Sequence, residues 1–319
     1  MTSTTTSRVT IDLEGLRQAV QACKIDTCRV RAGSGRGALE FEYARNDRSL
    51  ERLHKVNSVT KSVLSLLVGI ALARGEFPPL DTPLAGCLSR VPASLGRIRL
   101  HHLLSMTAGM DWPEWGAWGG RPNPMCESDD WVAFILERRA KASPGVAMSY
   151  NSGCSHLLSL ILQLESGMTA EAYAARHLFG PLGIDAWQWH TDPQGVSIGG
   201  FGLALRGGDL FKLGRLMLAR GRWNGRRIVS EDWVAASTAP RHHTYDWLGS
   251  YGYHWWTFTG GGRAPLVPHT YYAMGYGGQF LFVVPETETI VSFTSDLYRE
   301  PLRPLKIFSK YIAGVPYGS

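Results

Sequence analysis

The sequence lacks the features of membrane-spanning, secreted and nucleic-acid-binding proteins. Its apolar runs are too short and too interrupted to cross a bilayer. Residues 1–8 contain no basic region followed by an apolar run, so no secretory signal is expected. The net charge of +6 comes mostly from arginines scattered along the chain, and no basic run or arm is present. We therefore expect neither a membrane nor a nucleic acid as a partner.

Cysteines are few, and their spacing does not match the common redox and zinc motifs. The five cysteines are odd in number and never occur at Cys-x-x-Cys spacing, which favours reduced thiols and a cytoplasmic protein. None of the ten histidines has convincing metal-ligand spacing with another histidine, a cysteine or a carboxylate. The sequence therefore predicts neither a metal nor a cofactor. The cysteines are Cys23, Cys28, Cys87, Cys126 and Cys154.

The sequence does contain the pattern of an α+β protein. With 319 residues, of which 44% are hydrophobic and 19% charged, the chain can bury a large core. Strand patterns occur near both ends, and helical spacing predicts helices between them. This order predicts one antiparallel sheet assembled from both ends, flanked by helices, with an all-helical region inserted. The expected strands are 28–31, 38–43, 251–258, 279–284 and 289–294, and the expected helices are 11–22, 56–72, 100–107, 129–140, 154–166, 171–179, 209–220, 230–237 and 302–313.

The same pattern predicts how the chain is divided. Residues 1–75 are expected to form the first part of an α/β domain, with an N-terminal helix, a hairpin and an apolar helix. Residues 76–194 are expected to form the helical region, and residues 195–319 the second part of the α/β domain. The glycine cluster 33–37 precedes a strand and not a helix, so it predicts a flexible turn and not a phosphate-binding loop.

The segment 56–72 carries a lysine at the start of an apolar stretch. After Lys61 it is apolar on nearly every side, which predicts a helix buried all round. A buried ammonium is costly unless it is paired or loses its proton. Ser58 lies three residues earlier on the same helix face, where a lysine can activate a hydroxyl as a nucleophile. The alternative is that Ser58 caps the helix and Lys61 reaches solvent from its first turn.

The loop 111–124 contains three tryptophans, Trp112, Trp115 and Trp118. Long loops are usually functional or disordered, and this aromatic content is atypical of disorder. The indoles either form the wall of a pocket or pack on the protein's own core.

The segment 195–199 has the Gly-x-Ser-x-Gly pattern of the α/β-hydrolase nucleophile elbow, with Ser197 at its centre. An elbow needs a strand before it and a helix directly after it. Pro193 precedes this segment, and Gly200 and Gly202 follow it, so a helix cannot begin where the elbow needs one. We therefore expect the nucleophile to lie elsewhere.

Four segments taken together are more specific than any one of them: Ser58-Val59-Thr60-Lys61-Ser62, His102-Leu103-Leu104-Ser105-Met106-Thr107-Ala108-Gly109, Tyr150-Asn151-Ser152-Gly153 and Tyr276-Gly277-Gly278-Gln279. With these motifs the chain resembles the serine β-lactamase and penicillin-binding-protein superfamily from about residue 25 to its C-terminus. Within it, the chain is most similar to the class C-like serine hydrolases that include esterases and 6-aminohexanoate-dimer hydrolases. The resemblance implies a β-lactamase/transpeptidase-like α+β fold.

The resemblance also implies roles for the matching residues. Ser58 would be the acylated nucleophile, Lys61 its proton partner and Tyr150 the group that relays a proton to the leaving group. A phenolate is stabilised beside a cationic lysine, which agrees with this role. The backbone N–H groups of Ser58 and Gln279 would form the oxyanion hole. The expected activity is hydrolysis of a carboxylic ester or amide through an acyl-enzyme.

Two motifs depart from the family's pattern. The second usually reads Tyr-x-Asn, whereas Ser152 stands at its third position and Asn151 one place earlier. The third usually reads Lys-Thr-Gly, whereas Tyr276, Gly277 and Gly278 stand here. The cation that pairs with a penicillin carboxylate is therefore missing from this motif. Ester or amide hydrolysis is favoured, and β-lactamase or D-amino-acid peptidase and transpeptidase activity is the alternative.

The expected substrate is a small ester or amide with an uncharged, largely apolar acyl group. Aromatic walls with no fixed cation would leave a substrate carboxylate unpaired, although Arg121 or Arg263 could supply a cation from a loop. A non-catalytic ligand-binding module of the same fold is a further alternative, but it has no need to keep serine, lysine and tyrosine together. The expected substrate-binding residues are Asn151, Ser152, Tyr276, Gly277, Gly278, Trp112 and Trp115.

Overall fold

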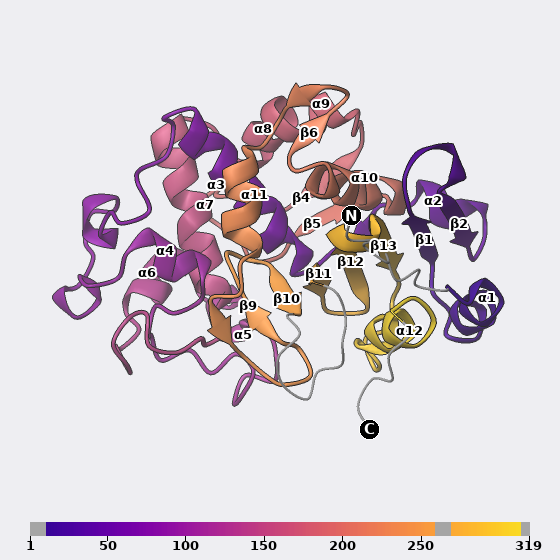
Figure 1. The fold of residues 1–319 in the computed structure, drawn as a ribbon. Helices are drawn as coiled ribbons and strands as arrows, with labels where there is room; N and C mark the ends of the chain where they lie inside the picture. The colour runs from indigo at the N-terminus through magenta and orange to yellow at the C-terminus, as the bar shows by residue number, and fades with distance from the viewer. Residues whose placement is uncertain (1–10, 259–268, 314–319) are drawn as a thin grey trace, which may run out of the picture.

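The computed structural model describes residues 11–258 and 269–313. Its largest sheet has eight antiparallel strands, and both ends of the chain contribute to it (Figure 1). The N-terminal strand β1 pairs with the C-terminal strand β13, and Val30 lies opposite Val291. In sheet order the strands are β2 (Leu39–Ala44), β1 (Thr27–Ala32), β13 (Thr289–Thr294), β12 (Gln279–Val284), β11 (Thr270–Gly275), β10 (Trp256–Phe258), β9 (Ser250–Tyr251) and β8 (His242–His243).

Helices cover both faces of this sheet. Side chains alternate between the two faces of a strand, so neighbouring residues of β12 enter different cores. Leu281 packs with the core that contains α10 (Gly207–Leu218), whereas Phe282 stacks on Phe308 of α12 (Arg303–Tyr311) at 4.0 Å between ring centroids. α1 (Leu13–Ala22) packs beside α12. Because both faces are covered, all six residues of β12 are buried.

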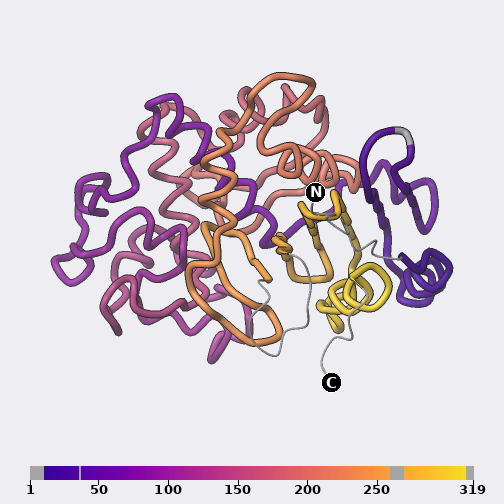
Figure 2. The backbone as a smooth tube through the Cα atoms, viewed as in Figure 1, coloured from indigo at the N-terminus to yellow at the C-terminus, as the bar shows by residue number. Residues whose placement is uncertain are grey.

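Most of the remaining helices form a second region beside the sheet, as the ribbon and tube views both show (Figures 1 and 2). Two small sheets accompany them, β3 (His54–Lys55) with β5 (Leu203–Leu205) and β4 (Trp187–Trp189), and β6 (Arg222–Trp223) with β7 (Arg226–Arg227). The short helix α2 (Asp47–Glu51) lies apart from them, beside β2. The other helices are α3 (Val59–Ala73), α4 (Leu100–Leu104), α5 (Asn123–Cys126), α6 (Trp131–Leu136), α7 (Ser152–Ser166), α8 (Ala170–Ala174), α9 (Gly180–Leu182) and α11 (Glu231–Thr238).

α3 lies between the sheet and the helical region. It packs against β11 on one side and α7 on the other, and 13 of its 15 residues are buried. A helix that is apolar on nearly every side is stable only when it is enclosed in this way. Its N-terminal end, where Ser58 and Lys61 lie, is therefore held at the junction of the two regions.

The α+β, β-lactamase/transpeptidase-like fold expected from the sequence is confirmed, but several element boundaries differ. β11 was not expected, and the single strand expected at 251–258 is two short strands, β9 and β10. The helix expected at 100–107 ends at Leu104, close to Met106, whose φ of 58° is left-handed. The division at residues 75 and 194 remains a prediction. No helix among the described residues is long and apolar enough to cross a membrane.

The close contact between α3 and α11 gives a stability prediction. A Cβ atom added at Gly69 would lie 2.2 Å from the indole of Trp233, which is itself held by a 2.9 Å hydrogen bond to the Ser65 carbonyl. We expect Gly69→Ala to lower the free energy of unfolding by about 1–3 kcal/mol through overpacking, measured by urea denaturation. Gly37→Ala, where a Cβ meets nothing within 4 Å, is the control and should change it by less than about 0.5 kcal/mol. Equal effects of the two substitutions would contradict the prediction.

Candidate active site

Ser58 stands directly before the first residue of α3. The preceding Asn57 has a left-handed φ of 48°, and its side chain donates a 2.5 Å hydrogen bond to the Tyr276 carbonyl, which ties this turn to the end of β11. The Ser58 side chain makes no capping bond with α3. Its hydroxyl oxygen instead accepts a 3.0 Å hydrogen bond from Lys61 Nζ. The serine is therefore placed at the helix start but is bonded to the lysine one turn later.

Lys61 is enclosed, with 1% of its surface exposed. Its Nζ donates to Ser58 Oγ at 3.0 Å, Ser152 Oγ at 3.0 Å and the Gly200 carbonyl at 2.7 Å. Burial disfavours the charged form and lowers the pKa of Lys61 to about 8, although the negative charge of Glu114 acts in the opposite direction. A neutral amine that can accept a proton is thus accessible near neutral pH, and Lys61 does not reach solvent.

Tyr150 lies just before α7 and is buried beside Ser58 and Lys61. The Ser58 side chain interacts with its phenol, and Lys61 Nζ lies 4.7 Å from the centre of its ring. Burial raises the pKa of Tyr150 well above its ordinary value. Burial therefore outweighs the stabilisation that a nearby cationic lysine gives a phenolate. Tyr150 is therefore a neutral phenol that can donate or relay a proton.

The second motif places Ser152, and not Asn151, beside Lys61. The Asn151 side chain accepts a 3.1 Å hydrogen bond from Cys154 N and caps α7, which turns it away from the lysine. Both residues are buried and already bonded. The geometry therefore argues against Asn151 and Ser152 as direct substrate contacts, and Ser152 instead supports Lys61.

Glu114 is the residue at this site that the sequence motifs missed. It is 2% exposed and accepts hydrogen bonds from Trp112 Nε1 at 2.8 Å, Ser152 N at 2.7 Å and Ser152 Oγ at 2.7 Å. The only hint in the sequence is a glutamate within the tryptophan-rich loop. Trp112, expected to contact substrate, belongs to the hydrophobic core and holds this carboxylate instead.

The third motif forms the tight turn between β11 and β12. Gly277 and Gly278 have φ values of 84° and 85°, and a Cβ at Gly278 would lie 2.4 Å from Ser295 Oγ, so the turn requires glycine. Gln279 is 1% exposed, and its side-chain amide bonds the Gly277 and Ser295 carbonyls. It begins β12 as the register partner of Gly275 and does not line the cavity at Ser58.

The structure brings Tyr276, and not Gln279, to the cavity at which the oxyanion donor was expected. Tyr276 lines the cavity together with Ser58. The backbone N–H groups of Ser58 and Tyr276 lie outside the regular helices and strands. Neither donates a hydrogen bond to a backbone carbonyl of the described residues. Two backbone donors beside the same cavity are what an oxyanion hole requires.

The cavity at Ser58 has a volume of about 200 Å³ and mostly apolar walls. Trp115 stacks on Tyr150 at 4.6 Å between ring centroids and forms one wall, whereas Trp118 packs on Trp112 at 4.8 Å away from the cavity. The Arg121 guanidinium lies over the Tyr276 ring at 5.1 Å, and Arg263 is outside the described residues. The walls include Trp115, Tyr150, Trp247, Met274, Tyr276 and Leu302.

The alternative nucleophile Ser197 lies in an unsuitable place. Its side chain is completely buried, and its hydroxyl accepts a 3.2 Å hydrogen bond from Glu171 N. Ser197 belongs to an isolated bridge with Thr191, and the next helix, α10, begins only at Gly207. The strand, turn and helix of a nucleophile elbow are not formed here.

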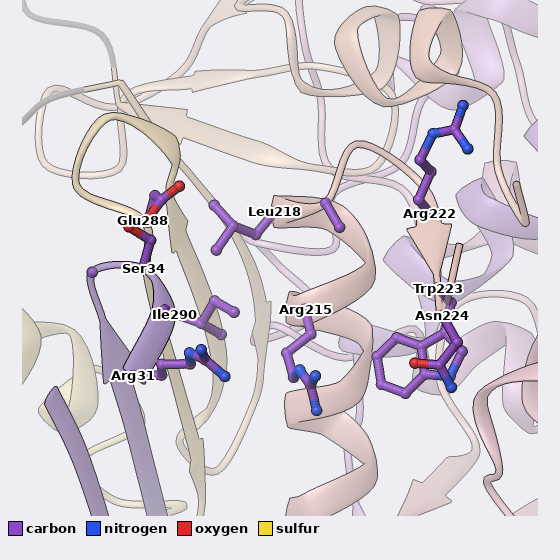
Figure 3. Close-up of a pocket in the computed structure, with 12 residues that line it drawn as sticks. Arg31, Ser34, Arg215, Leu218, Arg222, Trp223, Asn224, Glu288 and Ile290 are labelled. Atoms are coloured by element: carbon purple, nitrogen blue, oxygen red, sulfur yellow. The ribbon is translucent and has the colours of Figure 1, made fainter. Parts of the chain in front are cut away.

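A larger hollow, of about 350 Å³, lies between the β1–β2 turn and α10 (Figure 3). Arg31 and Arg215 point toward it from the two sides, whereas Arg222 points away. Its described lining residues include Ser34 and Glu288 but no lysine, histidine or tyrosine that could form a catalytic pair with Ser34.

Among residues 11–258 and 269–313, no group of three or more histidines, cysteines and carboxylates could hold a metal ion. The Ser58 cavity is therefore the candidate active site.

Comparisons with known proteins agree with this geometry. The Beta-lactamase family model matches residues 48–306. The 6-aminohexanoate-dimer hydrolase of Paenarthrobacter ureafaciens is 25% identical over 307 residues, which cover 88% of this chain and 74% of that protein. The octameric penicillin-binding protein homologue of Pyrococcus abyssi superposes with a TM-score of 0.74 at 18% identity, over 96% of this chain and 78% of that chain. A D-stereospecific amidohydrolase of Streptomyces sp. superposes with a TM-score of 0.69 at 15% identity, over 95% of this chain and 99% of that chain.

The two structural neighbours support the fold, and the family model spans both parts of the candidate site, from Ser58 to the β11–β12 turn. The chain therefore belongs to the Beta-lactamase family and is a serine hydrolase.

Proposed function

We propose that this enzyme cleaves a carboxylic ester or a linear amide through an acyl-enzyme on Ser58. The observation that carries the proposal is the 3.0 Å hydrogen bond between Lys61 Nζ and the Ser58 hydroxyl, with Ser58 and Tyr150 lining one apolar cavity. A hydroxyl becomes a useful nucleophile when an adjacent base takes its proton. The relative from Paenarthrobacter ureafaciens, named for hydrolysis of an amide dimer, adds linear amides to the candidate substrates.

The proposed reaction uses only groups of this chain. Neutral Lys61 takes the proton of Ser58 Oγ as this oxygen attacks the substrate carbonyl, and the N–H groups of Ser58 and Tyr276 stabilise the resulting oxyanion. Tyr150 passes a proton to the leaving alcohol or amine as the carbonyl–leaving-group bond breaks. Water then attacks the acyl-enzyme, with its proton accepted by the Lys61–Tyr150 pair, and the acid is released.

The proposed substrates carry an uncharged, largely apolar acyl group. The cavity walls are dominated by aromatic and aliphatic side chains, and Arg121 is engaged over the Tyr276 ring at the cavity's edge. A substrate carboxylate in the cavity would lose its hydration without gaining a fixed cationic partner among the lining residues that the structure describes. The third motif also lacks the lysine that β-lactam binding uses in the family. The cytoplasmic location expected from the cysteines remains a prediction.

This preference can be measured on one preparation. We expect kcat/KM for p-nitrophenyl butyrate to exceed that for nitrocefin by at least about 100-fold, because about 2.7 kcal/mol of binding to the β-lactam carboxylate is missing. p-Nitrophenyl acetate serves as the control for intrinsic ester reactivity. A higher kcat/KM for nitrocefin would favour the β-lactamase alternative, and activity on D-amino-acid peptides alone would favour the peptidase alternative.

A further inference from the structure

We propose that Glu114 is a positioning residue that fixes the direction of the Ser152 hydroxyl and thereby points the Lys61 lone pair at Ser58. The inference rests on the proposed function, in which Lys61 is the base. It extends that function to a carboxylate that lies outside the serine, lysine and tyrosine motifs.

The Glu114 carboxylate accepts every hydrogen bond that it makes with the described residues. Its two oxygens receive three donors, the Trp112 indole N–H, the Ser152 backbone N–H and the Ser152 hydroxyl, at 2.7–2.8 Å. An ionised carboxylate only accepts hydrogen bonds, so it satisfies all three donors at once. Three donors thus converge on one carboxyl group that is 2% exposed.

The direction of the Ser152 hydroxyl follows from this carboxylate. A serine hydroxyl has a single proton, and Ser152 gives it to Glu114 Oε1. The same oxygen lies 3.0 Å from Lys61 Nζ, so toward the lysine it can only accept. Ser152 is thereby held as an acceptor for as long as Glu114 is ionised.

Among the described residues that bond to it, the Lys61 amine then has one partner that can give it a proton. Of its three hydrogen-bond partners, the Gly200 carbonyl always accepts, and Ser152 is held as an acceptor. A neutral amine has two N–H donors and one lone pair, so these two acceptors use both donors. The lone pair is left for the hydroxyl proton of Ser58, 3.0 Å away. Glu114 thus selects Ser58 as the hydroxyl that Lys61 deprotonates.

The charge of Glu114 has a second, separable effect on Lys61. The other titratable groups that face the lysine are Tyr150, Cys154 and His254, from the segments before, within and beyond α7. Burial keeps the phenol and the thiol protonated, and it lowers the pKa of His254 to about 3, so all three are neutral near pH 7. Glu114 is therefore the negative charge that faces Lys61 in the described part of the chain, and it favours the ammonium form.

Glu114→Gln tests both effects. It removes the negative charge, and it reverses the direction of the hydrogen bond between the Ser152 hydroxyl and residue 114. The Gln oxygen can replace Oε2, which accepts two N–H donors, and its NH₂ group then meets Ser152 Oγ. The NH₂ group donates to Ser152, whose own proton becomes available to the Lys61 lone pair. We expect kcat/KM for p-nitrophenyl butyrate at high pH to fall roughly 10- to 100-fold. The apparent pKa of the acidic limb of the pH profile of kcat/KM should fall by about 1, because a negative charge near Lys61 is lost.

Ser152→Ala and the double variant show whether Glu114 acts through Ser152. In the Ser152→Ala background, Glu114→Gln should change the high-pH kcat/KM by less than about twofold, because the hydroxyl that it would redirect is absent. Glu127→Gln, which changes an exposed glutamate near the same loop, is the control and should match the wild type. Circular dichroism and thermal unfolding establish that each variant is folded.

The outcomes separate this inference from the proposed function. Retained Ser58-dependent hydrolysis with an unchanged pH profile in Glu114→Gln would overturn the role of Glu114 but leave the proposed function intact. Equal rate losses for Glu114→Gln with and without Ser152 would likewise overturn it, as would a loss of rate with no movement of the acidic limb. Failure of the proposed function would instead appear as hydrolysis that does not depend on Ser58.

Discussion

Ser58→Ala should abolish hydrolysis of p-nitrophenyl butyrate, with kcat/KM falling roughly 10⁴- to 10⁶-fold. The substitution removes the oxygen that attacks the carbonyl, and neither Lys61 nor Tyr150 can form the ester intermediate in its place. The fold should survive, because the Ser58 side chain makes no capping bond with α3 and only its contacts with Lys61 and Tyr150 are lost. We expect the free energy of unfolding to change by about 1 kcal/mol or less, measured by urea denaturation.

Ser197→Ala is the matched control for that experiment. It also removes one serine hydroxyl, but from a side chain that is fully buried and bonded to the Glu171 backbone. The rate should stay within about twofold of the wild type when the variant is folded. Activity that persists in Ser58→Ala and vanishes in Ser197→Ala would show that the nucleophile is Ser197. A mass increase from a trapped acyl group, located on the peptide that contains Ser58, would identify the nucleophile directly.

The sequence predicted the buried elements best. The apolar stretch after Lys61 predicted an enclosed helix, and α3 is buried at nearly every position. The same physical reason explains the strand that was missed. β11 is covered on both faces, so the segment 270–275 shows no alternation of polar and apolar residues and gives no strand signal by periodicity.

The candidate site was predictable only as far as local spacing determines geometry. Ser58 and Lys61 lie one helical turn apart, so the helix alone brings them together. Glu114 and Ser152 are 38 residues apart, and no local pattern predicts their contact. The structure places Tyr276, and not the expected Gln279, at the Ser58 cavity for another reason. Which backbone N–H faces Ser58 depends on where β11 ends and the turn begins, and Tyr276 and Gln279 stand at opposite ends of that turn.

Lys61→Arg should be nearly inactive, with kcat/KM for p-nitrophenyl butyrate lowered roughly 10²- to 10⁴-fold across the pH range. In the wild type, burial lowers the pKa of Lys61 to about 8, so the reactive neutral amine is scarce at pH 6 and predominant at pH 9. The wild-type rate should therefore rise with pH through an apparent pKa near 8, which belongs to the coupled Lys61–Tyr150 pair.

An arginine cannot reproduce this behaviour, because its guanidinium stays protonated over the whole range and cannot take the Ser58 proton. The residual rate of Lys61→Arg should accordingly lack the rise near pH 8. Lys55→Arg, at an exposed position of β3, is the matched control and should keep both the rate and the pH profile of the wild type. The measurement is kcat/KM from pH 6 to 10 for the three proteins. A Lys61→Arg rate close to that of the wild type would show that Lys61 contributes charge alone, and that another group removes the proton of Ser58.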